Sequence, residues 1–130
     1  MLEYVTDTHP LFWYFADPKK LGRNAKVAFQ QMENGSALIY ISAIVLCEMH
    51  FANVKEGRPV DMAEVFNEIG QHACFQLKSV EPEDVLDFDA DFAVPEMHDR
   101  MIVGLARRFG LPLITKDESI VKSKLVRIVW

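Results

Sequence analysis

Apolar and polar residues alternate along the chain in a way that predicts strands and helices in turn. Short apolar runs rich in β-branched and aromatic residues predict five strands, at residues 2–6, 37–41, 75–80, 111–115 and 126–130. The intervening stretches predict helices, at residues 11–15, 18–33, 43–56, 61–70, 82–88 and 96–109. Strands that alternate with helices are typical of a parallel sheet covered on both faces, so we expect one α/β domain over residues 1–130.

Turn and capping residues mark the ends of several predicted helices. Asp17 is a suitable N-cap with Pro18 at the first helical position, and Asn34-Gly35 ends that helix. Ser42 can cap the next helix, and Gly110 closes the last long one.

Two acids directly follow predicted strands. Asp7 comes after the first strand, and Asp117 comes two residues after the fourth. The carboxyl ends of parallel strands form the ligand crevice of open α/β sheets, so these side chains are candidates for one site. Asp also starts turns and caps helices, and either acid alone is compatible with that structural role.

Two further acids lie on predicted helix faces that carry apolar residues. Asp99 shares a face with Ile102, Val103 and Ala106 and lies in the first helical turn, where the helix dipole favours negative charge. Glu48 falls on a predicted core stripe formed by Ile44, Cys47, Glu48, Phe51 and Ala52. A carboxylate on a core face costs several kcal/mol unless it is paired or binds a metal. No Arg or Lys lies three or four residues from Glu48, so the helix offers no ion-pair partner, and this favours metal binding by Glu48.

Four carboxylates gathered at one edge of a sheet would repel one another. Hard divalent cations such as Mg²⁺ and Mn²⁺ remove this repulsion because they take oxygen ligands and keep several waters. A metal held in this way can orient and help deprotonate a water and neutralise charge on a phosphodiester. The sequence therefore predicts a metal site formed by Asp7, Glu48, Asp99 and Asp117.

These acids in their local context resemble the PIN-domain ribonucleases, and in particular the small VapC-type toxins. The matching segments are Asp7-Thr8-His9, the run 41–48 that ends in Glu48, His98-Asp99-Arg100 with the apolar residues that follow, and the run 113–117 that ends in Asp117. Together they extend over nearly the whole chain.

The resemblance implies a three-layer α/β/α fold with a mostly parallel five-stranded sheet and a Mg²⁺- or Mn²⁺-dependent endoribonuclease activity. It places Asp7, Glu48, Asp99 and Asp117 on the acidic quartet, as metal ligands and catalytic residues, with Thr115 and Thr8 in supporting positions. It also implies a homodimer and inhibition by a small antitoxin of the VapB type. This chain is more acidic than many such toxins.

The remaining polar residues leave alternatives open. Arg100, Lys116 and His9 are candidate contacts to RNA, although a surface ion pair is an equal alternative for Arg100 and a structural role is one for His9. The aromatic run 12–15 could stack on bases or pack in the core.

Net charge and composition say less about the function than the four acids at the predicted site do. The net charge is −5 with a pI near 5.3, which disfavours broad nucleic-acid binding. Basic residues nevertheless cluster in two places, at Lys19, Lys20, Arg23 and Lys26 and again at Arg107, Arg108, Lys116, Lys122, Lys124 and Arg127. From Glu81 to Asp99 there are eight acids and no Lys or Arg.

The sequence also bears on where the protein acts. No apolar run reaches the roughly 18 residues of a membrane span, and residues 1–4 lack the basic start of a signal peptide. We expect Cys47 and Cys74 to be buried free thiols, which fits a reducing compartment, and we therefore expect a cytoplasmic protein with no membrane partner.

Two other functions are compatible with acids at strand ends. One is a non-catalytic PIN-like module that binds nucleic acid or protein and keeps the quartet for its fold. The other is a receiver-type signalling domain, which predicts paired acids after the first strand and an Asp after the third. Here Asp7 stands alone and the run 75–80 ends without such an Asp.

Overall fold

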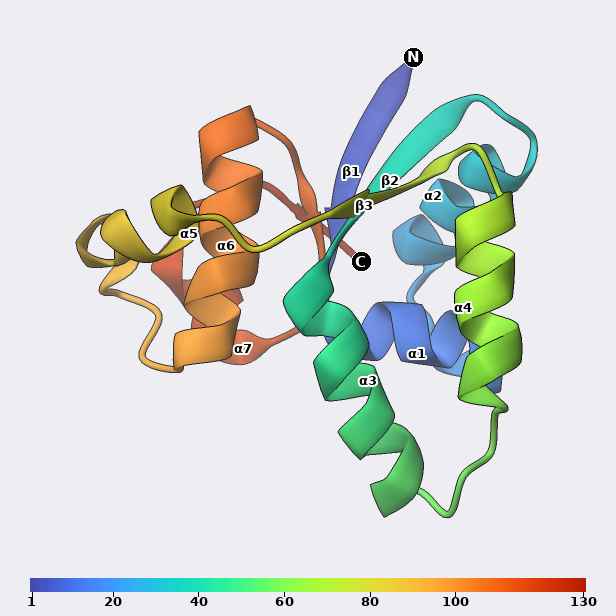
Figure 1. The fold of residues 1–130 in the computed structure, drawn as a ribbon. Helices are drawn as coiled ribbons and strands as arrows, with labels where there is room; N and C mark the ends of the chain where they lie inside the picture. The colour runs from blue at the N-terminus through green and yellow to red at the C-terminus, as the bar shows by residue number, and fades with distance from the viewer.

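A sheet of five parallel strands forms the centre of the computed structural model, which describes residues 1–130. The strands are β1 (Leu2–Thr6), β2 (Ala37–Ser42), β3 (Phe75–Lys78), β4 (Leu113–Ile114) and β5 (Ile128–Val129), in the spatial order β3-β2-β1-β4-β5. Every neighbouring pair is parallel, and β1 lies in the middle between β2 and β4 (Figure 1). The predicted five-stranded parallel sheet is confirmed.

The strand order also decides against one alternative function. Receiver-type domains have the order 2-1-3-4-5, in which the third strand is central. Here β3 is an edge strand, and it ends at Lys78 without an acid. The chain therefore does not have the receiver fold. Its order reverses between β1 and β4, which places the ligand crevice of such sheets beyond the carboxyl ends of these two strands.

Helices cover both faces of the sheet. Seven α-helices are present: α1 (Thr8–Ala16), α2 (Arg23–Glu33), α3 (Ala43–Lys55), α4 (Met62–Gln71), α5 (Pro82–Leu86), α6 (Met97–Phe109) and α7 (Glu118–Ser123). In Figure 1, α5, α6 and α7 lie on one side of the sheet, whereas α1, α2 and α4 lie on the other and α3 extends below the strand ends. None of these helices has the length and apolar character that crossing a bilayer requires.

One predicted helix is interrupted. Residues 18–33 form a short 3-10 helix, η1 (Pro18–Lys20), then an extended link at Leu21 and Gly22, and only then α2. Residues distant in sequence hold this link in place. Leu21 is buried in the core, and a Cβ on Gly22 would lie 2.6 Å from the ring of Trp130 and 2.7 Å from its backbone carbon. The prediction of one continuous helix was wrong because this contact is not visible in the local sequence.

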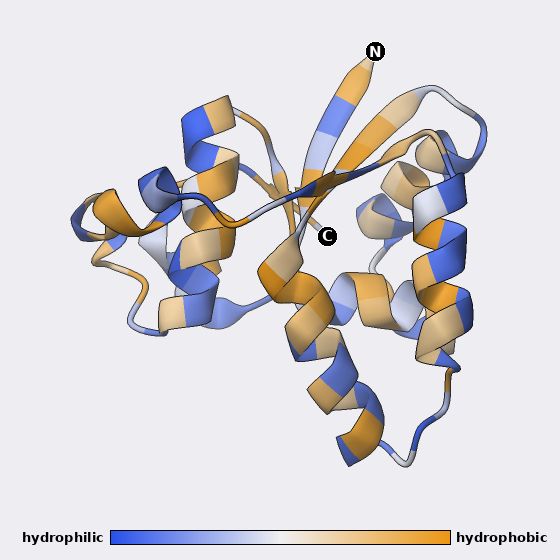
Figure 2. Ribbon diagram, in the orientation of Figure 1, coloured by the Kyte–Doolittle hydropathy of each residue, from blue (hydrophilic) through white to orange (hydrophobic).

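Apolar residues of the strands meet those of the inner helix faces in one core, and Figure 2 shows the strands mostly hydrophobic and the helices mixed. The predicted stripe on α3 was wrong. The buried residues of α3 are Val45, Met49 and Asn53, whereas Cys47 and Phe51 are exposed. Because α3 extends past the sheet and packs on α1 and α6, only this narrow side is covered. The expectation of two buried thiols was wrong, since Cys47 is exposed and Cys74 is half-buried.

The acidic run 81–99 is partly neutralised by two arginines of α6. Arg107 donates to both carboxylate oxygens of Asp91, over 2.8 Å and 3.2 Å, and also pairs with Asp87. Arg108 pairs with Asp84 on α5. These ion pairs hold α5 and the 3-10 helix η2 (Phe88–Asp91) against α6. Arg107 and Arg108 therefore serve the fold and are not part of an open basic surface.

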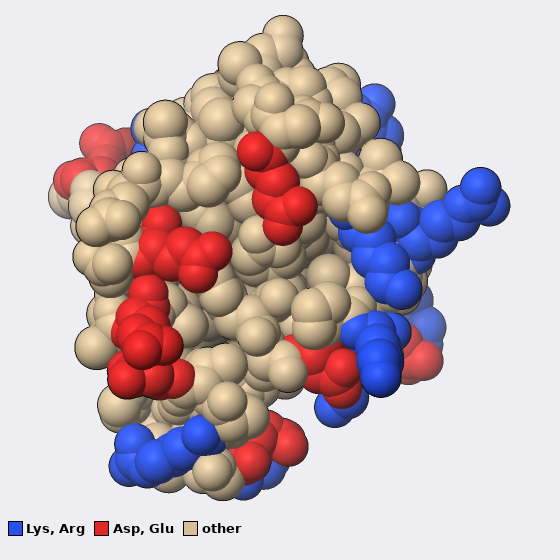
Figure 3. All heavy atoms as spheres, turned by 90° about the vertical axis from the view of Figure 1, so that its right-hand side faces the viewer, with Lys and Arg blue, Asp and Glu red and all other residues tan.

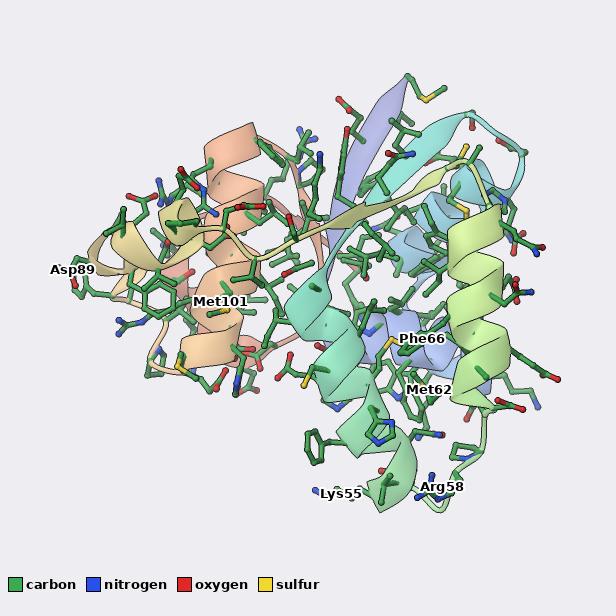
Figure 4. All side chains as sticks on the ribbon, viewed as in Figure 1. Lys55, Arg58, Met62, Phe66, Asp89 and Met101 are labelled. Atoms are coloured by element: carbon green, nitrogen blue, oxygen red, sulfur yellow. The ribbon has the colours of Figure 1, made fainter.

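We predict that Asp91→Ala lowers the free energy of unfolding by about 2 kcal/mol, because it leaves the bidentate Arg107 without its buried partner. Asp89→Ala is the matched control, since Asp89 lies two residues away and points outward at the edge of the molecule (Figure 4). It should change stability by less than about 0.5 kcal/mol. Urea unfolding measures the free energy of unfolding of both variants. Equal unfolding midpoints for Asp91→Ala and Asp89→Ala would contradict the role given to Asp91.

Candidate functional site

Asp7 stands at the point where the strand order reverses. It directly follows β1 and caps α1, and only 6% of its surface is exposed. Its Oδ1 accepts a hydrogen bond of 2.7 Å from the backbone N–H of Thr8, and its Oδ2 accepts one of 2.7 Å from the hydroxyl of Thr115. The side chain is therefore fixed by groups from both of the strands that flank the crevice.

Thr115 also positions the second acid at a strand end. Its Oγ1 accepts a hydrogen bond of 3.0 Å from the backbone N–H of Asp117. Asp117 then caps α7, since its Oδ1 accepts from the backbone N–H groups of Ser119 and Ile120. One buried hydroxyl thus connects the acids that follow β1 and β4.

The two helix-borne acids approach from either side. Glu48 on α3 is half-buried, and its Oε1 accepts a hydrogen bond of 2.6 Å from the hydroxyl of Thr8. Asp99 lies in the first turn of α6 and is also half-buried. Although the stripe used to select Glu48 was wrong, the residue does face the interior of the site, because α3 turns this side toward α1.

The four predicted acids line one hollow of about 270 Å³, together with Thr8, His9 and Glu96. Glu96 was not among the predicted site residues. It caps α6, where its Oε2 accepts a hydrogen bond of 2.8 Å from the backbone N–H of Asp99 and its Oε1 lies 2.8 Å from Nδ1 of His98. An acid three residues before Asp99, directly after Pro95, is a helix-start pattern that could have identified it.

The electrostatics of this hollow are dominated by negative charge. Burial raises the pKa of Asp7, although hydrogen bonds from Thr115 and Thr8 oppose this. Burial also raises the pKa of Glu48, and nearby Asp7 adds to the effect. For Asp99, burial followed by the charges of Asp7 and Asp117 raises the pKa to about 7. None of the four forms an ion pair with Lys or Arg, and two histidines lie near them: Nδ1 of His98 is 3.9 Å from Glu48, and His9 lines the hollow beside Asp7.

Such a donor set fits a hard divalent cation. The ligand atoms are carboxylate oxygens, which Mg²⁺ and Mn²⁺ prefer, and the site lacks the positive side chain that a purely structural acid cluster requires. Glu48, Glu96 and His98 also bring possible ligand atoms within 4.8 Å of one another at its rim. An acidic centre of this kind can bind a phosphodiester through a bridging cation and keep a water in place for attack.

The other candidate residues lie in different places. His9 lines the acidic hollow. Lys116 lines a second hollow beside it. Arg100 lines neither, because its guanidinium donates to the backbone carbonyls of Val94 and Phe92. Their roles toward RNA stay predictions.

Comparison with known proteins gives one family and a consistent set of folds. Residues 4–124 match the family described as the PIN domain. No curated protein sequence matches the chain significantly. Among solved structures, VapBC2 from Rickettsia felis, bound to a DNA fragment from their promoter, has a TM-score of 0.68 at 12% identity, covering 98% of this chain and 97% of that one.

Two further solved structures show the same fold. A toxin–antitoxin complex from Klebsiella pneumoniae has a TM-score of 0.63 at 18% identity, and FitAcB from Neisseria gonorrhoeae has a TM-score of 0.63 at 15% identity. Each comparison covers 98% of this chain and 96% of the other. The likeness establishes the three-layer arrangement.

We predict that the crowded carboxylates make the metal-free protein less stable as pH rises. Because the pKa of Asp99 is about 7 in the folded protein and 3.8 ordinarily, the folded state holds this proton more tightly than the unfolded state. Its contribution to stability is then full near pH 4 and lost by about pH 7. In EDTA, thermal unfolding from pH 4 to 8 should show a smaller loss for Asp99→Asn than for the wild type.

The exposed carboxylate of Asp89 provides the control, since Asp89→Asn should follow the wild-type profile. A profile of Asp99→Asn that coincides with the wild type would show that Asp99 does not carry the repulsion.

Proposed function

Because the chain belongs to the PIN domain family, whose members are generally nucleases, we propose that it is a metal-dependent endoribonuclease that hydrolyses phosphodiester bonds in RNA. The observation that carries this proposal is the set of four carboxylates around one hollow with no Lys or Arg to balance them. A fold alone does not establish which reaction a protein catalyses. An acidic site that needs an added cation limits the choice to metal-dependent reactions.

In this proposal each acid has a place. Asp7, Asp99 and Asp117 would hold Mg²⁺ or Mn²⁺, and Glu48 would act as a further ligand or as the base that orients water. When bound, the cation supplies Lewis-acid polarisation of the phosphodiester and lowers the pKa of a bound water. Thr115 and Thr8 keep Asp7 and Glu48 oriented through the short hydrogen bonds already described. Burial raises the pKa of Glu48, which makes this carboxylate a better proton acceptor than an exposed one.

The proposal also includes protein partners. Similar folds occur in VapBC2 and in a toxin–antitoxin complex, which supports the toxin of a VapBC-type pair that acts in the cytoplasm and is inhibited by a small antitoxin. A homodimer belongs to the same proposal. Phe51, Phe92 and Met97 expose 70%, 75% and 52% of their surface and offer apolar area for such contacts.

We predict that the purified protein cuts single-stranded RNA of mixed sequence when Mn²⁺ or Mg²⁺ is present and not in EDTA. Asp7→Asn and Asp99→Asn should lower the cleavage rate at least about 100-fold, because each removes a carboxylate that would hold the cation at the phosphodiester. Gel analysis of end-labelled RNA measures the rate, and circular dichroism checks the fold.

Asp89→Asn is the control, because Asp89 is an exposed acid of η2 that lies outside the site. This variant should cut RNA at the wild-type rate. If Asp99→Asn also cuts at the wild-type rate, the catalytic assignment is wrong. RNA binding without any metal-dependent cleavage would instead support the non-catalytic binding module.

We predict that expression of the wild type slows bacterial growth, that Asp99→Asn does not, and that co-expression of the small protein encoded beside it restores growth. Growth curves with matched expression levels test this. Toxicity that persists in Asp99→Asn would show that RNA cleavage is not its cause.

A further inference from the structure

We infer that the hollow next to the acidic site binds one unpaired nucleobase of the RNA strand, stacked on Trp13, on one side of the bond that is cut. This inference rests on the proposed function, because it places the base relative to the cleaved phosphodiester. It adds a base-binding subsite to the predicted acidic quartet.

The two hollows share part of their lining. The second has a volume of about 290 Å³ and is lined by Trp13, Thr115 and Lys116, together with Asp7, His9 and Asp117. The last three also line the acidic hollow. A volume near the lower end of the roughly 300–1,000 Å³ of small-molecule sites suits one base and not a folded partner. A phosphate held at the shared wall would therefore direct a neighbouring base into the second hollow.

The aromatic wall of this hollow is held in place without a ligand. Trp13 lies on α1 and stays partly exposed, whereas Leu11 and Phe12 supply the buried contacts of that helix. The ring of His9 lies 5.4 Å from that of Trp13, and the ring of Trp130 packs edge-on behind it at 5.9 Å. A partly exposed indole that is already fixed in place suits base stacking, and stacking does not depend on which base is present.

Trp130 is itself anchored by the link before α2. Its carbonyl accepts a hydrogen bond of 3.2 Å from the backbone N–H of Asn24, and its ring rests on Gly22, where a side chain would collide. The glycine is thus needed for the close approach that supports Trp13 from behind.

Two lysines mark this side of the site as the one that receives phosphate. Lys116 Nζ lies 4.9 Å from the Trp13 ring centre and 5.6 Å from that of Trp130, and Lys20 Nζ lies 5.9 Å from the Trp13 ring. Neither forms an ion pair, and both are exposed, so each ammonium group is free to move to a phosphate while the base takes the indole face.

Basic residues continue away from the hollow. Lys19, Lys20, Arg23 and Lys26 are all exposed on η1 and α2, and Figure 3 shows Lys and Arg side chains gathered mainly along one edge of the face that it presents. An acidic protein can therefore still carry a local path for the strand backbone. Trp13 lines the hollow that shares three residues with the acidic one, and Lys20 of this basic segment lies 5.9 Å from its ring, which favours a nucleic-acid strand as the ligand.

Tryptophan fluorescence tests the inference directly, because Trp13 and Trp130 are the two tryptophans of the chain. The test uses the non-cleaving Asp99→Asn protein, titrated with 12-nucleotide single-stranded oligo(U) and oligo(A) and with a 12-unit abasic ribose-phosphate chain. We expect saturable quenching by both RNAs and no quenching, with weaker binding, by the abasic chain. Equal quenching by the abasic chain would overturn the inference.

Cleavage by the otherwise wild-type enzyme gives a second measurement. Trp13→Ala should lower kcat/KM on single-stranded RNA by about 5- to 100-fold, whereas Trp13→Phe should stay within about 5-fold of the wild type. An abasic unit beside the cut site should lower cleavage by the wild type and have no further effect on Trp13→Ala. If Trp13 were only structural, Trp13→Ala and the abasic unit would lower kcat/KM independently, and the two factors would multiply.

Phe109→Ala is the matched control. Phe109 is also exposed and has a lysine, Lys78, 5.5 Å from its ring centre, but it lies at the opposite end of α6 from Asp99, about 15 Å away along the helix. This variant should cleave and bind like the wild type. Failure of the wild type to cut RNA at all would refute the proposed function, whereas cutting that is indifferent to Trp13 and to the abasic unit would refute only the base subsite.

Discussion

Mutual repulsion among four carboxylates, gathered with no Lys or Arg in ion-pair contact, is the constraint on which the organisation of this molecule depends. The acids come from the residue after β1, from α3, from α6 and from the turn after β4, so the sheet and the helices on both of its sides contribute to one site. Two threonine hydroxyls and several backbone N–H groups offset part of the cost. Burial first, and the neighbouring carboxylates after it, raise the pKa values of Asp7, Glu48 and Asp99.

The arginines of α6 neutralise acids at only one of its two ends. At one end of α6, Arg107 and Arg108 neutralise the acids of α5 and η2 and fix that segment to the helix. At the other end, Asp99 and Glu96 face Glu48 with only a histidine nearby. The same helix thus carries a compensated acidic cluster that stabilises the fold and an uncompensated one that is available to a ligand. Net charge, which is −5 for the chain, does not distinguish the two.

Sequence patterns were informative where local rules decide the structure. The five strands, the caps at Ser42 and Gly110, and the acids after β1 and β4 follow from periodicity and turn chemistry. The face of α6 that bears Asp99 was also predicted, because a full stripe of Ile102, Val103 and Ala106 is buried there. The buried side of α3 was not predicted, since it depends on packing against α1 and α6, which are distant from it in sequence. The break before α2 and the ion pairs of Arg107 likewise arise from residues that are distant in sequence.

The position of β1 has a consequence for the order in which the molecule is made. The central strand is synthesised first, but its neighbour β4 comes last but one, and the hydroxyl of Thr115 that orients Asp7 lies 108 residues away along the chain. Contacts of such long range close late in folding. A nascent chain on the ribosome therefore carries an incomplete set of acids until its final segment emerges. Under the proposed function, the site would therefore stay incomplete for nearly the whole of the protein's own synthesis.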